Sequence, residues 1–586
     1  MGSTFSGLNT VYTGIQAHQL ALDTVGQNLS NDSTEGYSRQ SVNLVATKAT
    51  SQTTLYGTSY VGSGVASASI TRARDTFADK NYWNENSTNS YYEAVQNNYT
   101  VVENVFNDSE ISDTEVGLQS SINSFWETWQ SLGTDASSSD ERISTRDTAV
   151  TMADKIKSMA SDMQSQISTN YSQLQADVSS VNTITAQIAD LNKSIIQLEA
   201  NGGSANDLRD QRDELVDNLS KYLKVNVTEK SNGSYTISSD GSNLVDEGSS
   251  VELATQASNN SQYGVTDYTL TIKATGTIFN PSDGEIKALQ DNVSTNKSYI
   301  DKLADYSAFF LTTFNAQHKE GYGIDGANSG NGTTDTNFFG EDENSYQWID
   351  EKSSSTEGYE DAYVEKTNSS DGTTEKLRGI SLINELTVNS KITADGGTNY
   401  IATKGANKYT DSASYTDTNG NTVKTGDYID ANGNKVDYAD RITASNGTAG
   451  TADGTNAVSL STLFNTSLGD ATSISDTVKT AAGMVDSSGN YTGYSSTGNL
   501  SLNDYYNDTM TKLGSDSSNV DDYVTKTTST LTELDNTRQS VSGVNWNEEL
   551  TNMIKYQQGY SACARILTTM DEMLDKLINS TGTVGR

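Results

Sequence analysis

Hydrophobic residues recur three and four positions apart at both ends of the chain, a spacing that is typical of amphipathic helices. Near the N-terminus this stripe comprises Leu8, Val11, Ile15, His18, Leu22, Val25 and Leu29. Near the C-terminus it comprises Leu550, Met553, Gln557, Tyr560, Ala564, Leu567, Asp571, Leu574 and Ile578. A single helix would expose such a stripe to water. We therefore expect the two ends to pack together as a coiled-coil-like pair.

Helical patterns also fill much of the chain between its ends. The apolar spacing predicts helices at about residues 75–106, 144–199, 206–223, 284–317 and 503–539. The clearest stripe comprises Leu174, Val178, Val181, Ile184, Ile188, Leu191, Ile195 and Leu198. Proline interrupts helices, and Pro281 is the only proline in the chain. The sequence therefore predicts a bundle of long helices.

For the helix at about 206–223 the sequence also predicts the N-cap and the exposure of its charged face. The preceding "NGGSAND" ends one helix with glycine and offers Asn206 or Asp207 as the N-cap of the next. Within "DLRDQRDELVDNL" arginine and aspartate recur at helical spacing, which is typical of exposed ion pairs. We expect a solvated, charged face on this helix.

From Val225 the period changes to two, which indicates β-strands. Asn232-Gly233 lies between alternating residues and predicts a hairpin, and strand-like segments continue to about Phe279. Residues 321–454 are rich in Gly, Asn, Asp, Ser and Thr, and they hold a thirteen-residue repeat, "YTDTNGNTV" from Tyr415 and "YIDANGNKV" from Tyr428. We interpret the repeat as two hairpins within a β-rich, surface-facing insertion.

These patterns predict a multidomain α+β protein. Residues 1–60 with 540–586 form a helical inner domain from both termini. Residues 61–320 with 500–539 form a long helical-bundle domain that contains a small β region at about 225–283. Residues 321–499 form the variable β-rich outer insertion and its return segment.

Composition limits the classes of partner. The 586 residues include 38 Lys and Arg against 76 Asp and Glu, a net charge of −38, which should repel nucleic acid and anionic membrane surfaces. The chain has one cysteine, so it can form no intrachain disulfide. We find no run of eighteen apolar residues and no cleavable signal peptide, so we expect no membrane association.

Candidate chemistry is sparse. His18 lies in the N-terminal stripe, where a packing role is the simpler interpretation, and His318 has no Cys or His at metal-ligand spacing. Cys563 lies inside the C-terminal helix as a packed or idle thiol. The loop "DTNGN" resembles a calcium loop, but its glycine stands at the fourth position and an EF-hand needs it at the sixth. We predict no enzymatic activity, no cofactor and no metal.

The segment "SGLNTVYTGIQAHQLALDTVGQNLSNDSTEGYSRQSV" resembles the N-terminal segment shared by bacterial flagellar rod, hook and hook-associated proteins. The segments "NDLRDQRDELVDNLSKYLKVNV", "FNAQHKEGYG" and "SVSGVNWNEELTNMIKYQQGYSACARILTTMDEMLDKLI" resemble those of its hook-associated members at the hook–filament junction. The resemblance covers about residues 1–45, 75–320 and 500–580.

The resemblance implies a structural protein that is exported, without cleavage, by the flagellar type III apparatus. It implies a ring of copies between the hook and the filament, which acts as a mechanical adapter and an assembly platform. The expected partners are other copies, the hook protein, the second junction protein (hook-associated protein 3), and an export chaperone on the C-terminal helix. Gly36 and Tyr37 would form the bend after the first helix, and these two residues, Arg39 and the terminal stripes would form the assembly interface.

Three alternatives stay open at this level. The chain could be the hook protein or another axial flagellar protein, although the hook protein is not expected to carry helices at 144–199 and 206–223. The Asn/Gly/Thr-rich middle could belong to a surface adhesin, which would need a conventional secretion signal. A flagellar component with a hydrolase in its insertion would need paired carboxylates or a zinc motif, and we find neither.

Overall fold

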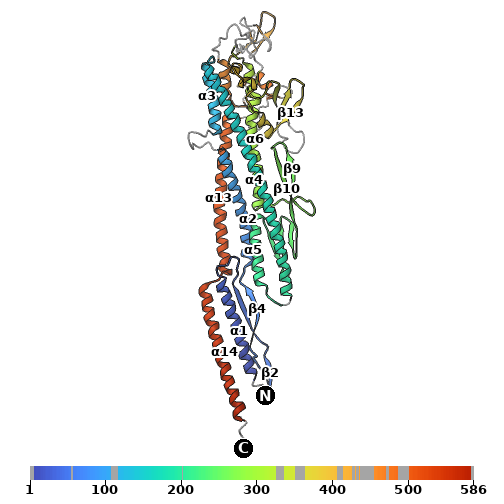
Figure 1. Ribbon diagram of the computed structural model, residues 1–586, viewed down its shortest axis with the longest axis vertical. Coiled ribbons are helices and arrows are strands. Elements are labelled where there is room, and N and C mark those ends of the chain that lie inside the picture. The colour runs from blue at the N-terminus through green and yellow to red at the C-terminus, as the bar shows by residue number, and fades with distance from the viewer. Residues whose placement is uncertain are drawn as a thin grey trace.

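A computed structural model shows an elongated, mostly helical molecule with both chain ends at one tip (Figure 1). It describes residues 5–54, 57–106, 117–200, 202–321, 323–324, 336–349, 363–405, 413–424, 429, 434–435, 454–469, 474, 476–485 and 500–581. Its long helices are α1 (Phe5–Ser30), α2 (Thr76–Phe106), α3 (Leu118–Thr134), α4 (Ser139–Glu199), α5 (Asn206–Tyr222), α6 (Glu285–Phe309), α13 (Leu502–Ser542) and α14 (Trp546–Thr581).

Helix α4 runs the length of the helical body and packs against α3, α5 and α6, while α2 packs along α13. The helix begins five residues earlier than the apolar pattern predicts, because the Ser138 hydroxyl accepts a hydrogen bond from the Glu141 amide and caps it. The predicted stripe is confirmed over most of its length, with Leu174, Val178, Val181, Ile188 and Ile195 buried.

The prediction for the last turn of α4 is wrong, because Leu198 is 47 % exposed and Asn192 is fully buried. The Asn192 amide nitrogen donates to the carbonyls of Tyr235 and Glu247, and its oxygen accepts from the Tyr235 amide. This end of α4 is therefore anchored to a sheet through a polar side chain.

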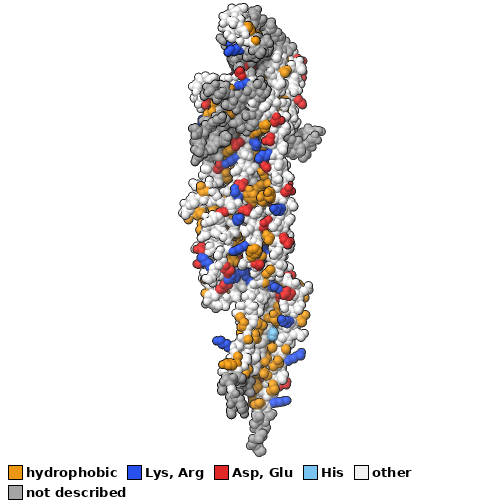
Figure 2. Space-filling view, turned by 180° about the vertical axis from the view of Figure 1, so that it is seen from behind, with side chains coloured by type: hydrophobic (Ala, Val, Ile, Leu, Met, Phe, Trp, Pro, Cys, Tyr) orange, Lys and Arg blue, Asp and Glu red, His pale blue; other side chains and the backbone are white. Residues whose placement is uncertain are grey.

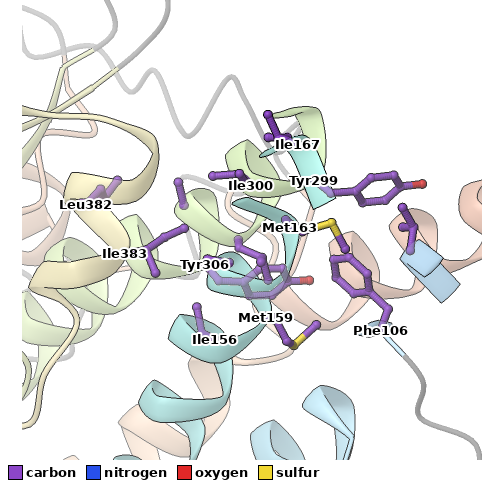
Figure 3. Close-up of a cluster of buried hydrophobic side chains, with 14 of the residues drawn as sticks. Phe106, Ile156, Met159, Met163, Ile167, Tyr299, Ile300, Tyr306, Leu382 and Ile383 are labelled. Carbon is purple, nitrogen blue, oxygen red and sulfur yellow. The ribbon is translucent and has the colours of Figure 1, made fainter. Parts of the chain in front are cut away.

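The core of the body lies between α4, α6 and a short helix from the middle of the chain, α8 (Gly379–Glu385). Figure 3 shows Ile156, Met159 and Met163 of α4 near Ile300 and Tyr306 of α6, with Leu382 and Ile383 of α8 at the left of the cluster. These side chains belong to one buried cluster. The helix predicted at 284–317 is confirmed, and it continues from α6 through a π-helical turn, η1 (Phe310–Phe314), into α7 (Asn315–Glu320).

A narrow β-ribbon follows α1. Its strands β1 (Gln40–Ala46) and β4 (Val65–Arg72) pair in an antiparallel ladder, and both lie against α1. A second antiparallel pair, β2 (Thr50–Thr54) and β3 (Gly57–Val61), lies between β1 and β4 in the sequence. The apolar pattern of the chain does not predict these strands, because their Ser/Thr-rich segments lack a clear apolar alternation.

The period-two region forms the predicted strands. A four-stranded antiparallel sheet has the order β5 (Asn226–Glu229), β6 (Tyr235–Ser239), β7 (Ser242–Asp246) and β8 (Ser249–Ser250). A long hairpin follows, made of β9 (Leu253–Asn260) and β10 (Val265–Ile272). The predicted Asn232-Gly233 turn joins β5 to β6, and Gly233 has the positive φ of +81° that favours glycine.

The segment after residue 321 mixes short strands and short helices. Its strands are β11 (Asn344–Ile349), β12 (Tyr363–Asn368), β13 (Thr374–Leu377), β14 (Tyr415–Thr416) and β15 (Thr422–Val423). Besides α8, its helical turns are α9 (Ser390–Thr393), η2 (Gly397–Tyr400), α11 (Thr455–Leu463) and α12 (Asp476–Ala481). The first repeat unit forms the β14–β15 hairpin, and Ile429 bridges Lys435 in the second, most of which lies outside the described residues.

Part of this segment belongs to the main core. Phe338 and Phe339 are fully buried, and their rings contact Phe310 and Phe314 of the π-helical turn and Phe125 of α3 at centroid distances of 5.2 to 6.0 Å. Residues 336–349 and 363–404 are therefore no separate surface module, although the sequence pattern suggested one.

Candidate functional site: the terminal helix pair and its joint with the body

The two terminal helices form the predicted pair. Helices α1 and α14 pack side by side over most of their length, and they run antiparallel (Figure 1). The His18 ring lies 6.2 Å from the Tyr556 ring, and the Asn28 amide reaches the Glu549 carboxylate at 3.3 Å. Segments more than five hundred residues apart in the sequence therefore share one packing surface.

Small residues let the two helices approach closely. A Cβ on Gly14 would lie 3.1 Å from the Cys563 sulfur, and a Cβ on Gly559 would lie 2.5 Å from the His18 ring. Ala17 and Ala21 are buried on the inner side of α1. The contact surface is thus built from Gly, Ala, Cys and one imidazole rather than from leucines alone.

The predicted interface residues of α1 lie beside this surface. Val25 is buried, whereas Leu8, Val11, Ile15, His18, Leu22 and Leu29 are half-buried. The inner positions between them are filled by Ala17, Ala21, Thr24 and Asn28. Small and polar residues carry little hydrophobic signal, which explains why the pattern placed the centre of the stripe one position away.

The predicted interface residues of α14 divide into two groups. Met553, Ala564, Leu567 and Leu574 are half-buried, while Leu550, Tyr560 and Ile578 are exposed, Ile578 by 68 %. The side of α14 that meets α1 instead carries Glu549, Tyr556, Gly559, Cys563 and Met570. In the single chain an apolar face of α14 therefore stays in contact with solvent.

Asn28 connects three segments where the helix pair meets the body. The side chain is 1 % exposed. Its nitrogen donates to the Gln40 carbonyl at 2.9 Å and to Glu549, and its oxygen accepts from the Tyr37 hydroxyl at 2.8 Å and the Gln40 amide at 2.9 Å. One amide group thus ties α1 to its following turn, to β1 and to α14.

The turn after α1 has the bend that was expected of it. Gly36 has a φ of +76°, and Tyr37 folds back onto α1 through its bond to Asn28. Arg39 then spans the break between α13 and α14: its amide donates to the Ser542 carbonyl at 2.8 Å, and its guanidinium pairs with Glu548 at 3.0 Å. Gly36, Tyr37 and Arg39 therefore build an intramolecular joint.

The charged face of α5 is buried, so the prediction of a solvated face is wrong. Asp210 and Asp213 are 6 % and 1 % exposed, and Arg72 at the end of β4 binds both, at 2.6 and 2.9 Å. Arg74 lies 3.5 Å from Asp213 and 2.9 Å from Asp79. Burial of these carboxylates is possible because arginines more than a hundred residues away neutralise them.

The start of α5 also differs from the prediction. Ala205 occupies the N-cap position, and Asn206 is the first helical residue. The Asn206 amide instead donates to the Gln40 side chain and to the Ile70 carbonyl, both at 3.1 Å. Gln40 in turn donates to Asp207 at 3.0 Å. The first turn of α5 therefore holds the β1–β4 ribbon instead of capping itself.

The pKa values of the two central carboxylates, Asp210 and Asp213, are shifted in opposite directions. Burial alone would raise the pKa of Asp213, but the guanidinium groups of Arg74, Arg72 and Arg212 outweigh it and hold that pKa below its ordinary value. For Asp210 burial prevails over the attraction of Arg72, and its pKa lies above the ordinary value. Asp213 is thus the ionised centre of the joint.

A third carboxylate of α5 connects the joint to two long helices. Asp217 accepts a hydrogen bond from the Trp83 indole at 2.6 Å and pairs with Arg538 of α13 at 2.6 Å. The Arg538 guanidinium also lies over the Tyr82 ring of α2, 3.9 Å from its centroid. Acidic side chains along α5 therefore fasten β4, α2 and α13 at one level of the molecule.

A second polar clamp holds the middle segment. Arg142 is 1 % exposed and donates to the carbonyls of Ala136, Thr398 and Ile401 and to the Thr403 hydroxyl. His318 accepts from the Ala402 amide at 2.9 Å, and its other ring nitrogen lies 2.9 Å from the Thr336 carbonyl. Burial lowers the pKa of His318 to about 4, so the ring is neutral and structural.

The described residues offer no arrangement for metal or redox chemistry. In those ranges no group of three or more His, Cys, Asp or Glu side chains is placed to hold a metal ion. Asp417 of the "DTNGN" loop accepts hydrogen bonds from the amides of Asn419, Asn421 and Lys435, so turn formation occupies its oxygens. Among the helices of the described ranges, none has the length and hydropathy to cross a membrane.

Two family models match the chain. Residues 100–339 match the helical domain of the flagellar hook-associated protein FlgK, and residues 537–580 match the C-terminal region of the flagellar basal body rod FlgEFG proteins. The first covers α3 to α6 and the second covers nearly all of α14.

Curated relatives match along the whole chain. Flagellar hook-associated protein 1 of Bacillus subtilis is 26 % identical over 593 residues, which cover 100 % of both chains. The protein of the same name from Salmonella typhimurium is 25 % identical and that from Escherichia coli is 24 % identical, each over 98 % of this chain and 99 % of its own length.

A solved structure shares the fold. The flagellar hook junction protein FlgK from Burkholderia pseudomallei superposes with a TM-score of 0.53 at 17 % identity, and the match covers 79 % of this chain and 100 % of that one.

Proposed function

This chain belongs to the flagellar hook-associated protein 1 family, and on that premise we propose that copies of it close into the ring between hook and filament. It is a structural protein of the bacterial flagellum, located outside the cell at the hook–filament junction, and it is not an enzyme. The alternatives of an adhesin or a hydrolase find no support in these matches.

The exposed apolar side chains of α14 carry this proposal. Figure 2 shows hydrophobic side chains gathered along the narrow part of the molecule that the terminal helices form. On α14 the exposed ones are Trp546, Leu550, Ile554, Tyr560, Ile566, Met573, Leu577 and Ile578. These side chains are distributed around α14, and exposed apolar side chains in this number on one helix are typical of a surface that other chains cover; copies packed around an axis would cover them.

The distribution of charge supports the same arrangement. Residues 1–74 and 540–586 together contain as many acidic as basic side chains, so the net charge of −38 belongs to residues 75–539. Neutral terminal units can pack closely without mutual repulsion, whereas the acidic bodies repel one another. We therefore place the terminal helices at the centre of the ring and the bodies outside.

The partners follow from this placement. The ring would rest on the hook protein, present its other side to hook-associated protein 3, and reach its place through the flagellar type III export apparatus. The exposed apolar side chains of α14 would be covered by an export chaperone before assembly. The ion-paired joint at α5 would couple the packed helices to the body, which suits an adapter between a flexible hook and a rigid filament.

Replacing Ile554 or Leu577 with aspartate tests the proposal. Both side chains are more than half exposed in the single chain, so the monomer should keep its free energy of unfolding. Assembly would bury the new charge, at a cost of several kcal/mol. We expect export into the medium and loss of attachment to isolated hooks, measured by immunoblot.

The matched control is Gln558→Asp, which places the same charge at an exposed polar position of α14. Attachment of all three variants at the wild-type level would show that the α14 face is not an assembly surface.

A further inference from the structure

Helix α14 extends past the helix on which it packs. Met570 lies against Gly7, and the other contacts between the two helices keep the same antiparallel register. This register places Phe5, where α1 begins, level with about Glu572. The last turns of α14, from Met573 onward, therefore lie beyond the start of α1, at the tip of the molecule (Figure 1).

These last turns present apolar side chains beside two carboxylates. Asp571, Leu574, Asp575 and Ile578 follow one another three or four residues apart or less, so they share one face of the helix, which we call the end face of α14. Leu574 is half-buried, whereas Ile578 and both carboxylates are exposed. The complement of the end face is an apolar surface that carries positive charge.

The hairpin of β2 and β3 lies at the same tip. Its base is fixed on α1, because the Val65 amide donates to the Thr13 hydroxyl at 3.3 Å, and the Thr47 amide closes the base by donating to the Gly64 carbonyl at 3.0 Å. From this level the hairpin continues toward the start of α1, where Figure 1 shows β2. The hairpin and the end face of α14 therefore occupy one end of the molecule.

The hairpin has little support within its own chain. Among the described elements, β2 and β3 pack extensively only on each other. A two-stranded hairpin without further packing is at best marginally stable in water. Its side chains Tyr60 and Val61 are 75 % and 44 % exposed. We therefore expect a surface of another chain to hold the hairpin in place.

Positive charge lies at the base of the hairpin. Residues 36–74 contain four basic residues and no acidic one. Arg39, Arg72 and Arg74 pair with carboxylates of their own chain. Lys48 is exposed and forms no ion pair with a described residue. Lys48, Tyr60 and Val61, which we call the hairpin surface, thus combine apolar side chains with an ammonium group.

We propose that the hairpin surface of one copy binds the end face of α14 in the next copy. This inference rests on the proposed ring. A ring needs a heterologous contact, in which two different surfaces of one chain meet, and rotation about the ring axis brings surfaces of equal height together. Both surfaces lie at the tip that we place at the centre of the ring, and their charges are opposite.

Charge reversal tests the contact in cells that carry each variant as their only copy. We expect Lys48→Glu and Asp571→Lys/Asp575→Lys each to lower the amount attached to isolated hooks by at least about tenfold, with export unchanged. The triple variant restores opposite charges across every contact and should regain most of the attachment. The control Lys80→Glu changes the net charge as Lys48→Glu does, at an exposed lysine of α2, and should attach like wild type.

The outcomes separate the two proposals. Failure of the wild-type protein to attach would overturn the proposed ring itself. Wild-type attachment of Lys48→Glu, or a triple variant no better than the two one-sided reversals, would overturn the hairpin contact while leaving the ring intact.

A cross-link tests the geometry independently of charge. Tyr60→Cys with Ile578→Cys, in a Cys563→Ala background, changes two side chains that are exposed in the single chain. Treatment of attached hook particles with a short bismaleimide should give a covalent ladder beyond the dimer, because each copy links to two neighbours. Either cysteine alone can give nothing larger than a dimer. Attached particles of the double variant that stay monomeric would overturn the contact.

Discussion

Asn28 decides the geometry of the joint at the scale of a single residue. Its amide supplies two donors and an acceptor, and all are used in a site that excludes water. Aspartate lacks the donors and leucine lacks every polar group, so no substitution of similar size keeps the bonds. In the sequence this asparagine is recognisable only as part of an Asn-rich turn.

Replacing Asn28 with alanine should weaken the joint without unfolding the body. The Gln40 amide and the Tyr37 hydroxyl would lose their partner in a buried site, at a cost of about 1–3 kcal/mol each. We expect faster hydrogen exchange at the Gln40 amide and unchanged exchange in α4. The control Asn9→Ala removes an exposed amide of α1 and should change neither.

Asp177 is a second residue whose state depends on its surroundings. It is 2 % exposed, one oxygen accepts from Gln173 at 2.9 Å, and the other has no hydrogen-bond partner among the described residues. Burial, with Glu285 of α6 nearby, raises the pKa of Asp177 to about 7. Lys221 of α5 lowers the pKa of Glu285, but burial and Glu93 outweigh it, so the pKa of Glu285 is also raised. Asp177 therefore holds its proton in the folded state up to near neutral pH.

The raised pKa predicts a pH dependence of stability. The folded state binds this proton more tightly than the unfolded state, so the contribution of Asp177 is lost as pH rises toward 7 and beyond. Between pH 5 and pH 8 the loss amounts to about 2–3 kcal/mol. Asp177→Asn should remove it, as chemical unfolding at both pH values would measure. Asp190→Asn, an exposed change on the same helix, should keep the wild-type dependence, and an equal dependence in Asp177→Asn would contradict the assignment.

At the scale of elements, α1 and α14 depend on small residues for their separation. Glycine at position 559 leaves room for the His18 ring, and glycine at position 14 leaves room for the Cys563 sulfur. These positions lower the intrinsic helix stability and are tolerated because close packing compensates. The helix pair is therefore sensitive to bulk at a few positions and insensitive elsewhere.

Gly559→Val should separate the pair. The new side chain would overlap the His18 ring, whose atoms lie 2.5 to 2.9 Å from the Cβ position. We expect limited proteolysis to remove α14 much faster than in wild type, with the body intact. Gly26→Ala is the control within the same pair: nothing lies within 4 Å of its Cβ position, and alanine should stabilise α1 by up to about 1 kcal/mol. Equal trimming of both variants would contradict the close-packing account.

Helix α5 shows why charge patterns mislead at this scale. Its Arg and Asp spacing matches that of an exposed helix, yet Arg212 is fully buried and stacks 3.4 Å from the Tyr235 ring centroid. Spacing along a helix reports only which side chains share a face. Whether that face meets water depends on Arg72, Arg74 and Arg538, which come from other elements.

At the scale of the whole molecule, the segment after residue 321 has two parts. One part packs into the core, and the other is inserted between Thr403 and Asn456. Residues 336–404 contribute Phe338, Phe339 and Ile401 to the core, and Arg142 clamps the end of this stretch. The chain then leaves and returns at one point, because the Asn456 amide donates to the Thr403 carbonyl at 2.9 Å. Residues between these two positions can therefore be removed without opening the core.

Replacing residues 406–453 with a short Gly/Ser linker should therefore leave a folded, exported protein that still attaches to hooks. The linker has to span only the short gap that the Thr403–Asn456 hydrogen bond holds closed. Replacing residues 326–450 removes the partners of Phe310 and Phe314 and should cost well over 5 kcal/mol, since each lost large aromatic costs about 3–5 kcal/mol. Thermal unfolding compares the two, and similar melting temperatures would contradict the shared core.

The sequence by itself determined most of the long helices, the strand region from Val225 and the pairing of the ends. Apolar spacing of three and four residues, a single proline and the Asn232-Gly233 turn are local signals, and local geometry follows from them directly. The resemblance to flagellar proteins can be recognised from the sequence for the same reason, because the matching segments are continuous in the chain.

Tertiary structure alone decided which charges are buried and which apolar residues stay exposed. Asp213 is buried because Arg72 and Arg74 arrive from the β-ribbon, and Leu577 is exposed because it lies two turns beyond Met570, which already faces Gly7 near the start of α1. Both outcomes depend on residues far away along the chain. Desolvation of a charge is favourable only when its partner is in place, and no periodicity within one helix records where that partner lies.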